Sequence, residues 1–231
     1  NMACVVHVHS GKFDSWLGAS TSKRSRTVRR QLNDNKTRMV VLTDEWKNRL
    51  EEHFRGLLCV SNPLDPSIIN TKQQRDRHHL LLMGRNDPVK GHAFAVKVAE
   101  SMKAIYPDLK LTMTGVSHVS QDWVTAKGWV SDSEKRHLLE TASVLLLPSS
   151  HEGQPMIVIE ALGSGLPVLA HQHLHSLPDE VTTADPNLEA WRVQLSEMIE
   201  SPQEIVFFAG KHDITEVQQR WAATYSSCLQ A

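Results

Sequence analysis

Two glutamates separated by seven residues, Glu152 and Glu160, could contribute carboxylates to a binding site. Glu152 stands in a turn that contains Gly153 and Pro155, whereas Glu160 has apolar neighbours inside a segment that predicts a helix. A carboxylate among apolar residues needs hydrogen-bond donors, which the paired hydroxyls of a ribose would supply. The alternative is a structural ion pair, and the spacing of two glutamates does not by itself decide between these two interpretations.

Arg85 and Lys90 share one turn between an expected strand and an expected helix, residues 84–91. A guanidinium fork and an ammonium group beside a helix N-terminus suit a diphosphate, because the N–H groups and the helix dipole there also favour negative charge. The alternative is a pair of solvated surface cations. A second helix start, at residues 153–157, also leaves backbone N–H groups unpaired within the helix, and Gly153 permits a ligand to approach the backbone closely.

Histidines alternate in two places. His7 and His9 end the first expected strand on one face, and they could act on a substrate or serve only as core or surface residues. His171, His173 and His175 alternate further along the chain, as zinc ligands on one strand face would. No carboxylate or cysteine pattern accompanies these three histidines, so we expect no metal site.

A basic run occupies residues 23–30, and three of its arginines, Arg26, Arg29 and Arg30, have helical spacing. The run from Lys23 to Arg30 could contact an anionic membrane surface or an anionic acceptor. A solvated helix face is the alternative. No aromatic residue interrupts the run, which argues against binding of single-stranded nucleic acid.

The elements that must position these residues alternate between strand and helix. Short apolar runs predict strands at residues 3–8, 39–42, 57–60, 80–83, 109–114, 128–130, 144–147 and 167–170. Periodic segments predict helices at residues 45–54, 90–105, 134–141, 155–162, 187–200 and 213–229. Residues 10–25, rich in Gly, Ser and Thr, predict a loop. The pattern indicates parallel sheets covered by helices, in which ligands bind beyond the carboxyl ends of the strands.

Composition is that of a globular protein, since 40% of the 231 residues are hydrophobic and 22% are charged. Lys plus Arg number 25 and Asp plus Glu 26, so a protein whose whole surface binds polyanions is excluded. Three dispersed cysteines, the lack of a signal-peptide pattern and the lack of an apolar run of about 18 residues lead us to expect a cytoplasmic protein.

Taken together, the motifs resemble the retaining nucleotide-sugar glycosyltransferases of the GT-B fold, family 4. Residues 148–168, with Glu152 and Glu160, look like that family's glutamate-x7-glutamate signature. Residues 84–91 look like its diphosphate turn, and residues 41–46 and 62–65 resemble the end of its acceptor domain and its linker. The resemblance implies an α/β fold with a complete C-terminal Rossmann-type donor domain and a truncated N-terminal acceptor lobe.

The resemblance also implies roles for single residues. Arg85 and Lys90 would hold the donor diphosphate, Glu152 the hydroxyls of the donor sugar, and Glu160 the ribose. His9 matches the histidine that faces the transferred sugar near its anomeric carbon, so the catalytic set is His9, Glu152, Arg85 and Lys90. The base would lie beside the backbone around Gly115 and Val130. The remaining implied donor contacts are Gly153, Gln154, Pro155 and Met156.

The resemblance divides the chain at residue 62. Residues 1–61 would be the remnant of the acceptor lobe, residues 62–205 the donor domain, and residues 206–231 a helix that crosses back to the first lobe. The family has a longer first domain with a glycine-rich loop, which the 61 residues here do not contain. We therefore expect a first lobe with few strands and a possible partner chain that supplies the missing part.

The function implied is transfer of a hexose from a UDP- or GDP-linked sugar to a glycan, lipid or small-molecule acceptor, with retention of configuration. No divalent cation or other cofactor is expected, because Arg85 and Lys90 would stabilise the leaving diphosphate and no Asp-x-Asp motif is present. The alternative is a nucleotide-sugar-binding module that needs a partner chain for catalysis. A dinucleotide-binding protein is disfavoured because no Gly-x-Gly-x-x-Gly follows a strand.

Overall fold

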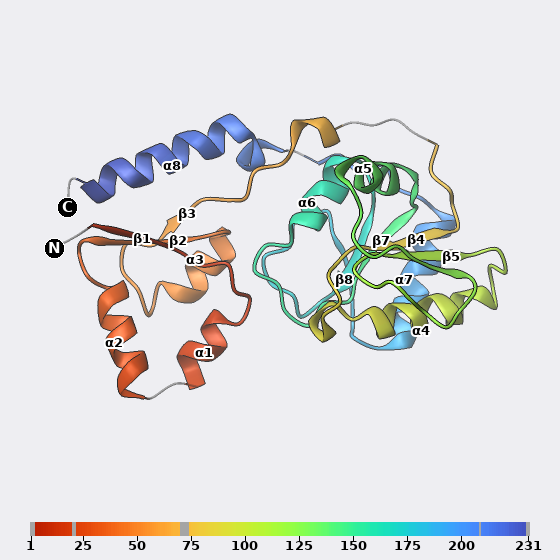
Figure 1. The fold of residues 1–231 in the computed structure, drawn as a ribbon, viewed down its shortest axis with the longest axis horizontal. Coiled ribbons are helices and arrows are strands. Elements are labelled where there is room, and N and C mark those ends of the chain that lie inside the picture. Colours follow the sequence, from red (N-terminus) through yellow and green to blue (C-terminus); the bar gives the residue numbers. More distant parts are fainter. Residues whose placement is uncertain (1–2, 20–21, 70–73, 208, 230–231) are drawn as a thin grey trace. The chain divides into compact units, whose positions relative to one another are not determined.

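The computed structural model describes residues 3–19, 22–69, 74–207 and 209–229, which form two compact units (Figure 1). The smaller unit consists of Asn1–Leu64, His151–Pro155 and Ala209–Ala231. The larger unit consists of Asp65–Ser150 and Met156–Phe208. The domain boundaries expected from the sequence differ from this grouping mainly at residues 151–155, which were expected in the donor domain and lie in the smaller unit.

The smaller unit contains a three-stranded parallel sheet in the order β1-β2-β3. Its strands are β1 (Cys4–His7), β2 (Thr37–Val41) and β3 (Leu58–Cys59). Its helices are α1 (Phe13–Ala19), α2 (Lys23–Leu32), α3 (Asp44–Leu50) and α8 (Ile214–Leu229), with a 3₁₀ turn at Gly210–His212. Figure 1 shows α1 and α2 on one side of this sheet and α8 on the other.

Alternation along β2 explains why both faces of the small sheet are covered. Met39 and Val41 pack with Leu17, Leu50 and other apolar residues of the first three helices. Val40, between them, points to the opposite face and packs with Val217 of α8. A strand that is apolar on successive residues therefore needs helices on both faces, and this sequence provides them.

The larger unit contains a six-stranded parallel sheet in the order β6-β5-β4-β7-β8-β9. Its strands are β4 (His79–Leu82), β5 (Lys110–Met113), β6 (Val124–Ala126), β7 (Val144–Leu147), β8 (Val168–His171) and β9 (Thr182–Ala184). Its helices are α4 (His92–Lys103), α5 (Asp132–Thr141), α6 (Met156–Gly163) and α7 (Leu188–Glu200), with 3₁₀ turns at Pro66–Ile68 and Pro88–Lys90. The chain reverses its winding direction between β4 and β7, which is where such sheets bind ligands.

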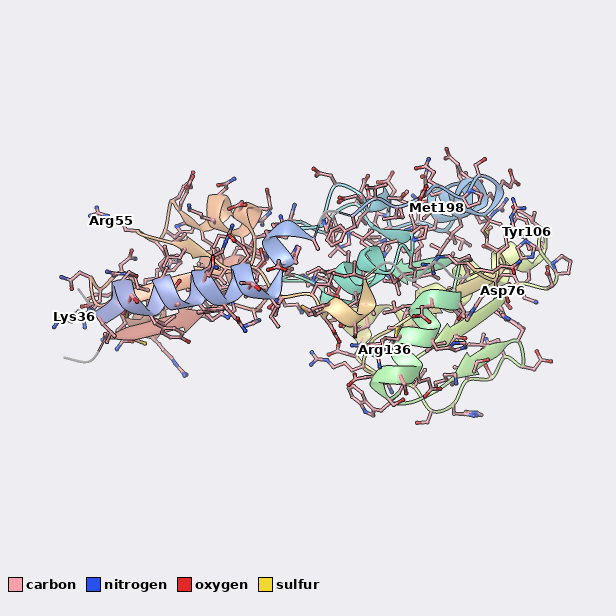
Figure 2. All side chains as sticks on the ribbon, turned by 90° about the horizontal axis from the view of Figure 1, so that it is seen from above. Lys36, Arg55, Asp76, Tyr106, Arg136 and Met198 are labelled. Atoms are coloured by element: carbon pink, nitrogen blue, oxygen red, sulfur yellow. The ribbon has the colours of Figure 1, made fainter. Side chains whose placement is uncertain are left out.

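The two ends of the large sheet differ in character. Its amino ends carry polar surface groups, among them an ion pair of Asp76 with Lys110 and a hydrogen bond from the Tyr106 hydroxyl to Glu200. Asp76 and Tyr106 are labelled at this end in Figure 2. The carboxyl ends instead run into the glycine-containing turns described below. The α/β fold class with parallel, helix-covered sheets is confirmed.

Two sequence predictions for short segments were wrong. Residues 10–25 contain α1 and the start of α2 rather than a loop, because Phe13 and Leu17 share one helix face and the Leu17 side chain is fully buried. Residues 128–130 do not form a strand: the strand lies earlier, at Val124–Ala126, and the Trp129 side chain is 87% exposed. The short edge strand β9 was not predicted, since Thr182–Ala184 has no apolar run.

The basic run forms a helix, as its spacing predicts. Arg29 and Arg30 lie in the last turn of α2, and Ser22 caps its N-terminus by accepting a hydrogen bond from the backbone N–H of Ser25. Among the residues that the structure describes, no helix is both long enough and apolar enough to cross a membrane.

Candidate functional site

In the smaller unit, the end of β1 lies directly against the loop formed by residues 151–155. A Cβ atom on Gly153 would lie 2.3 Å from the carbonyl oxygen of His9. A Cβ atom on Gly11 would lie 2.4 Å from the carbonyl oxygen of Glu152. Both distances are shorter than any van der Waals contact, so only glycines permit this approach. The structure therefore brings His9, Glu152 and Gly153 together.

Hydrogen bonds hold the 151–155 loop in place within this unit. The indole Nε1 of Trp46 donates to the carbonyl oxygen of Gly153 at 2.8 Å. The Gln154 side chain donates to the carbonyl oxygen of Leu42 at 3.1 Å and accepts from the backbone N–H of Asn62 at 2.8 Å. The side-chain amide of Gln154 is thus used to position the loop. A ligand would therefore contact the backbone of Gln154 rather than its side chain.

His9 is exposed and forms a hydrogen bond with His7. Nε2 of His9 lies 2.9 Å from Nδ1 of His7. Partial burial, and secondarily the neighbouring His9, lowers the pKa of His7 to about 4. His7 is therefore neutral near pH 7, because its pKa lies well below that pH.

In the larger unit, the turn after β4 presents the two predicted cations. The Asp87 carboxylate caps the 3₁₀ turn Pro88–Lys90 by accepting from the backbone N–H of Val89 at 2.9 Å. Arg85 Nε lies 3.3 Å from Asp87, and its side chain is 69% exposed. The bond from Val89, together with Arg85, holds the pKa of the Asp87 carboxyl below its usual range. Lys90 packs over Gly84, where a Cβ atom would lie 3.2 Å from Lys90 Cγ.

Glycines bring three strand ends of the large sheet together. Gly115, with φ of +77°, follows β5, and a Cβ atom there would lie 2.0 Å from the carbonyl oxygen of Gly84. Gly91, with φ of +71°, would place a Cβ atom 2.4 Å from the carbonyl oxygen of Pro148, which follows β7. The edge beyond β4, β5 and β7 is consequently lined by backbone, which a flat or anionic ligand could approach closely.

The segment that contains Val130 is joined to the same edge. The backbone N–H of Gly115 donates to Gly128 at 2.6 Å, and the N–H of Gly128 donates to Val116 at 2.7 Å. Val130 follows Gly128 by two residues. Of the predicted site residues, the structure thus brings Arg85, Lys90, Gly115 and the Val130 segment to one edge of this unit.

Glu160 lies on α6 and forms an ion pair. Its Oε1 is 2.9 Å from Nζ of Lys135 on α5, and the Glu160 side chain is 12% exposed. The carboxylate lies among apolar residues and needs hydrogen-bond donors, of which Lys135 is one. A carboxylate has about four acceptor positions, so Lys135 leaves capacity for hydroxyl groups. Met156 is the first residue of α6, and the buried Pro155 precedes it.

The predicted site residues belong to both units. The smaller unit holds His9, Glu152, Gly153, Gln154 and Pro155. The larger unit holds Arg85, Lys90, Gly115, Val130, Met156 and Glu160. Sequence reasoning missed Lys135 and the loop-fixing role of Trp46, since their partners lie 25 and 107 residues away along the chain.

Of the three alternating histidines near β8, His171 belongs to the core, whereas His173 and His175 are exposed. His171 ends β8, is 6% exposed and accepts a hydrogen bond from Trp191 Nε1 at 3.1 Å. Burial, followed by the influence of His173, lowers the pKa of His171 to about 4. His173 lies beyond the strand and bonds to the carbonyl oxygen of Ser150. Within the described ranges, no group of three His, Cys, Asp or Glu side chains could hold a metal ion.

Comparison with known proteins identifies the class. The family model described as Glycosyl transferases group 1 matches residues 77–201. An uncharacterized glycosyltransferase of Haemophilus influenzae is 28% identical over 145 residues, which are 58% of this chain and 41% of that relative. Because the family model covers more than half of the sequence, the chain belongs to the glycosyl transferases group 1 family.

Solved structures support the fold. The pneumococcal O-GlcNAc transferase GtfA, in complex with UDP and GlcNAc, matches with a TM-score of 0.74 and 15% identity, over 98% of this chain and 53% of that one. A GtfA/B complex matches with a TM-score of 0.73 and 17% identity, over 97% of this chain and 52% of that one. The structural neighbours are GT-B glycosyltransferases, as the sequence predicted. The chain spans about half the length of these three proteins.

Proposed function

We propose that this chain binds a nucleoside diphosphate sugar, UDP- or GDP-linked, and transfers its hexose to an acceptor with retention of configuration. The observation that carries the proposal is the edge of the large sheet, where Arg85 and Lys90 share one turn with the glycine-lined approach of Gly84 and Gly115. Two cations beside a glycine-lined edge at a sheet switch point suit a diphosphate linked to a flat base.

The proposed roles are those that the resemblance implies, and the positions of the groups within each unit support them. Arg85 and Lys90 would bind the diphosphate and stabilise the charge that develops on it as the glycosidic bond breaks. Glu160, oriented by Lys135, would accept hydrogen bonds from the ribose hydroxyls. His9 and Glu152, adjacent in the smaller unit, would contact the transferred sugar, with backbone N–H groups at Gly153 and Gln154.

The proposed reaction uses these side chains without a metal ion. The leaving diphosphate accepts the electron pair of the anomeric C–O bond, and the acceptor hydroxyl forms the new bond on the same face of the sugar. The leaving phosphate oxygen would take the acceptor's proton. This front-face course, and membership of the retaining family 4 group, stay predictions. Anomeric analysis of the product by NMR tests the retention that both require.

A substitution at Glu160 tests whether this carboxylate binds the ribose or serves only in a structural ion pair. We expect Glu160→Gln to weaken UDP or GDP binding about 10-fold or more, because a hydrogen bond to a charged group contributes about 1.5–3 kcal/mol. Inorganic diphosphate has no ribose, so its affinity should stay at the parental value. Isothermal titration calorimetry with a panel of UDP- and GDP-sugars, UDP, GDP and diphosphate measures both. No binding by the panel, or parental UDP and GDP affinities for Glu160→Gln, contradicts the assignment.

A donor-binding module that needs a partner chain is the second candidate. Its support is that the chain spans about half of the proteins it matches, one of which is a complex of two proteins, GtfA/B. Release of nucleoside diphosphate, measured with and without candidate partners, distinguishes the two candidates. Robust transfer by this chain alone would eliminate the module.

The acceptor is proposed to be a glycan or a lipid-linked molecule. The basic helix α2 supports peripheral contact with an anionic membrane, because Lys23, Arg26 and Arg30 are exposed on it. Arg29 instead donates a hydrogen bond to the carbonyl oxygen of Leu17. Sedimentation with vesicles of phosphatidylglycerol and of phosphatidylcholine tests this contact, and equal binding to both would reject it. The expected cytoplasmic location stays a prediction, which cell fractionation can test.

A further inference from the structure

His7 contacts both His9 and a helix that the proposed chemistry does not use. The His7 and His9 rings are 4.0 Å apart between centroids, and Nδ1 of His7 lies 2.9 Å from Nε2 of His9. On its other side, the His7 ring makes an edge contact with Trp221 of α8, with centroids 4.9 Å apart. In the parallel pairing with β2, the residue opposite His7 is Val40. Among these neighbours, His9 is the titratable group that faces His7.

The burial of the two imidazoles is unequal. His9 is exposed, whereas Nε2 of His7 is buried and has no hydrogen-bond partner among the described residues. The hydrogen bond to His9 is therefore the polar contact of the His7 ring. With its pKa lowered to about 4, His7 is neutral near pH 7 and carries a single ring proton.

The position of that proton follows from the burial. If His7 donated from Nδ1, its buried Nε2 would be an unprotonated acceptor. If His9 donated instead, His7 would bury an N–H group without a partner; among backbone groups, buried orphan N–H groups are rarer than under-satisfied carbonyls, and we apply the same order to the imidazole. The first arrangement is favoured, and in it Nε2 of His9 accepts the hydrogen bond, which places the ring proton of His9 on Nδ1.

We propose that His7 is a positioning residue, which fixes the His9 ring and its tautomer so that His9 presents Nδ1–H as a donor to the substrate. The proposal deepens the proposed function, on which the role of His9 rests. Without His7, the exposed His9 ring could rotate and exchange tautomers, and its donor would be present in only part of the population.

Three substitutions at position 7 separate positioning from packing. Asparagine can place a hydrogen-bonding atom where Nδ1 of His7 stands, whereas glutamine places one where Nε2 stands, at the atom without a partner. Phenylalanine keeps a ring against Trp221 but forms no hydrogen bond. His7→Asn is therefore the conservative variant, while His7→Gln and His7→Phe are matched losses of the contact to His9.

The measurements are the ¹⁵N chemical shifts of the His9 ring and steady-state kinetics with the donor sugar. We expect the parent and His7→Asn to show the Nδ1–H form of His9, and His7→Gln and His7→Phe to show mixed tautomers. In those two variants kcat should fall about 10- to 100-fold, by analogy with the loss of a hydrogen-bond partner of a metal-binding histidine, with KM for the donor unchanged.

The outcomes distinguish this proposal from the proposed function. A parental protein in which His9 carries its proton at Nε2 overturns the positioning role directly and does not depend on the folding of any variant. Parental tautomers and parental kcat in all three variants also overturn it. If the parent binds no nucleotide sugar while the His9 tautomer responds to His7 as expected, the proposed function fails and the positioning of His9 stands.

Discussion

Replacing Arg85 with alanine is expected to lower kcat about 10²- to 10³-fold. The arginine lies on an exposed turn whose shape is set by other groups: the Asp87 cap on Val89, the 3₁₀ turn and the positive φ of Gly91. Its removal should therefore leave the turn folded and remove mainly charge stabilisation. Loss of one preorganised group that stabilises transition-state charge costs about 10²–10³ in kcat. Initial rates at saturating donor sugar measure the effect.

The charge and the position of Arg85 can be tested separately. Arg85→Lys keeps a cation but loses the planar fork, so its kcat should lie between those of the parent and Arg85→Ala. Lys90→Ala should show a loss similar to that of Arg85→Ala, since both cations would face the same leaving group. Lys97→Ala, an exposed lysine on α4, provides the matched control and should retain parental kcat. A loss in Lys97→Ala equal to that in Arg85→Ala would contradict a local role for the turn.

Local chemistry made the helix starts of this fold predictable. Thr43 and Ser131 cap α3 and α5 by accepting hydrogen bonds from the backbone N–H groups of Trp46 and Glu134. A cap depends on residues only three positions apart, so the sequence contains all the information that it needs. The buried strands β4, β7 and β8 were predictable for a related reason. A short unbroken apolar run is typical of a parallel strand that is buried on both faces.

Contacts between distant segments were not predictable in the same way. The loop of residues 151–155 follows a strand of the larger unit but packs on His9 and Gly11 of the smaller one, through contacts that span more than 100 residues of sequence. The Gly, Ser and Thr content of residues 10–25 suggested a loop, yet burial of Leu17 stabilises α1. Tertiary packing outweighed the loop propensity of these residues. Such packing cannot be read from a single sequence.

The candidate site was predictable where one short segment holds the chemistry. Arg85 and Lys90 are five residues apart, and their shared turn could be inferred from sequence alone. The Lys135–Glu160 ion pair joins two helices, and its existence depends on how α5 and α6 pack. The sequence raised an ion pair as an alternative for Glu160 without indicating which cation would form it.

Gly115→Ala is expected to lower the free energy of unfolding by about 2–5 kcal/mol. Two costs combine: a left-handed φ of +77° for alanine, about 1–2 kcal/mol, and overlap of the new Cβ atom with the carbonyl oxygen of Gly84, about 1–3 kcal/mol. The overlap is with backbone, so no side chain can rotate to relieve it. Domains are stable by about 5–15 kcal/mol, which makes this a large fraction of the total. Urea denaturation of the parent and the variant measures the difference.

Gly128→Ala separates the two costs. Gly128 also has a positive φ, of +62°, but a Cβ atom there would meet no described atom within 4 Å beyond its immediate chain neighbours. Gly128→Ala should therefore lower the free energy of unfolding only by the conformational cost, about 1–2 kcal/mol. The difference between the two variants then measures how tightly the strand ends after β4 and β5 approach each other. Equal losses would mean that the backbones of Gly84 and Gly115 separate at little cost, and that the glycine-lined edge is not a preformed surface for a diphosphate. A larger loss in Gly115→Ala, accompanied by weaker nucleotide binding, would tie this approach of two strand ends to recognition of the donor.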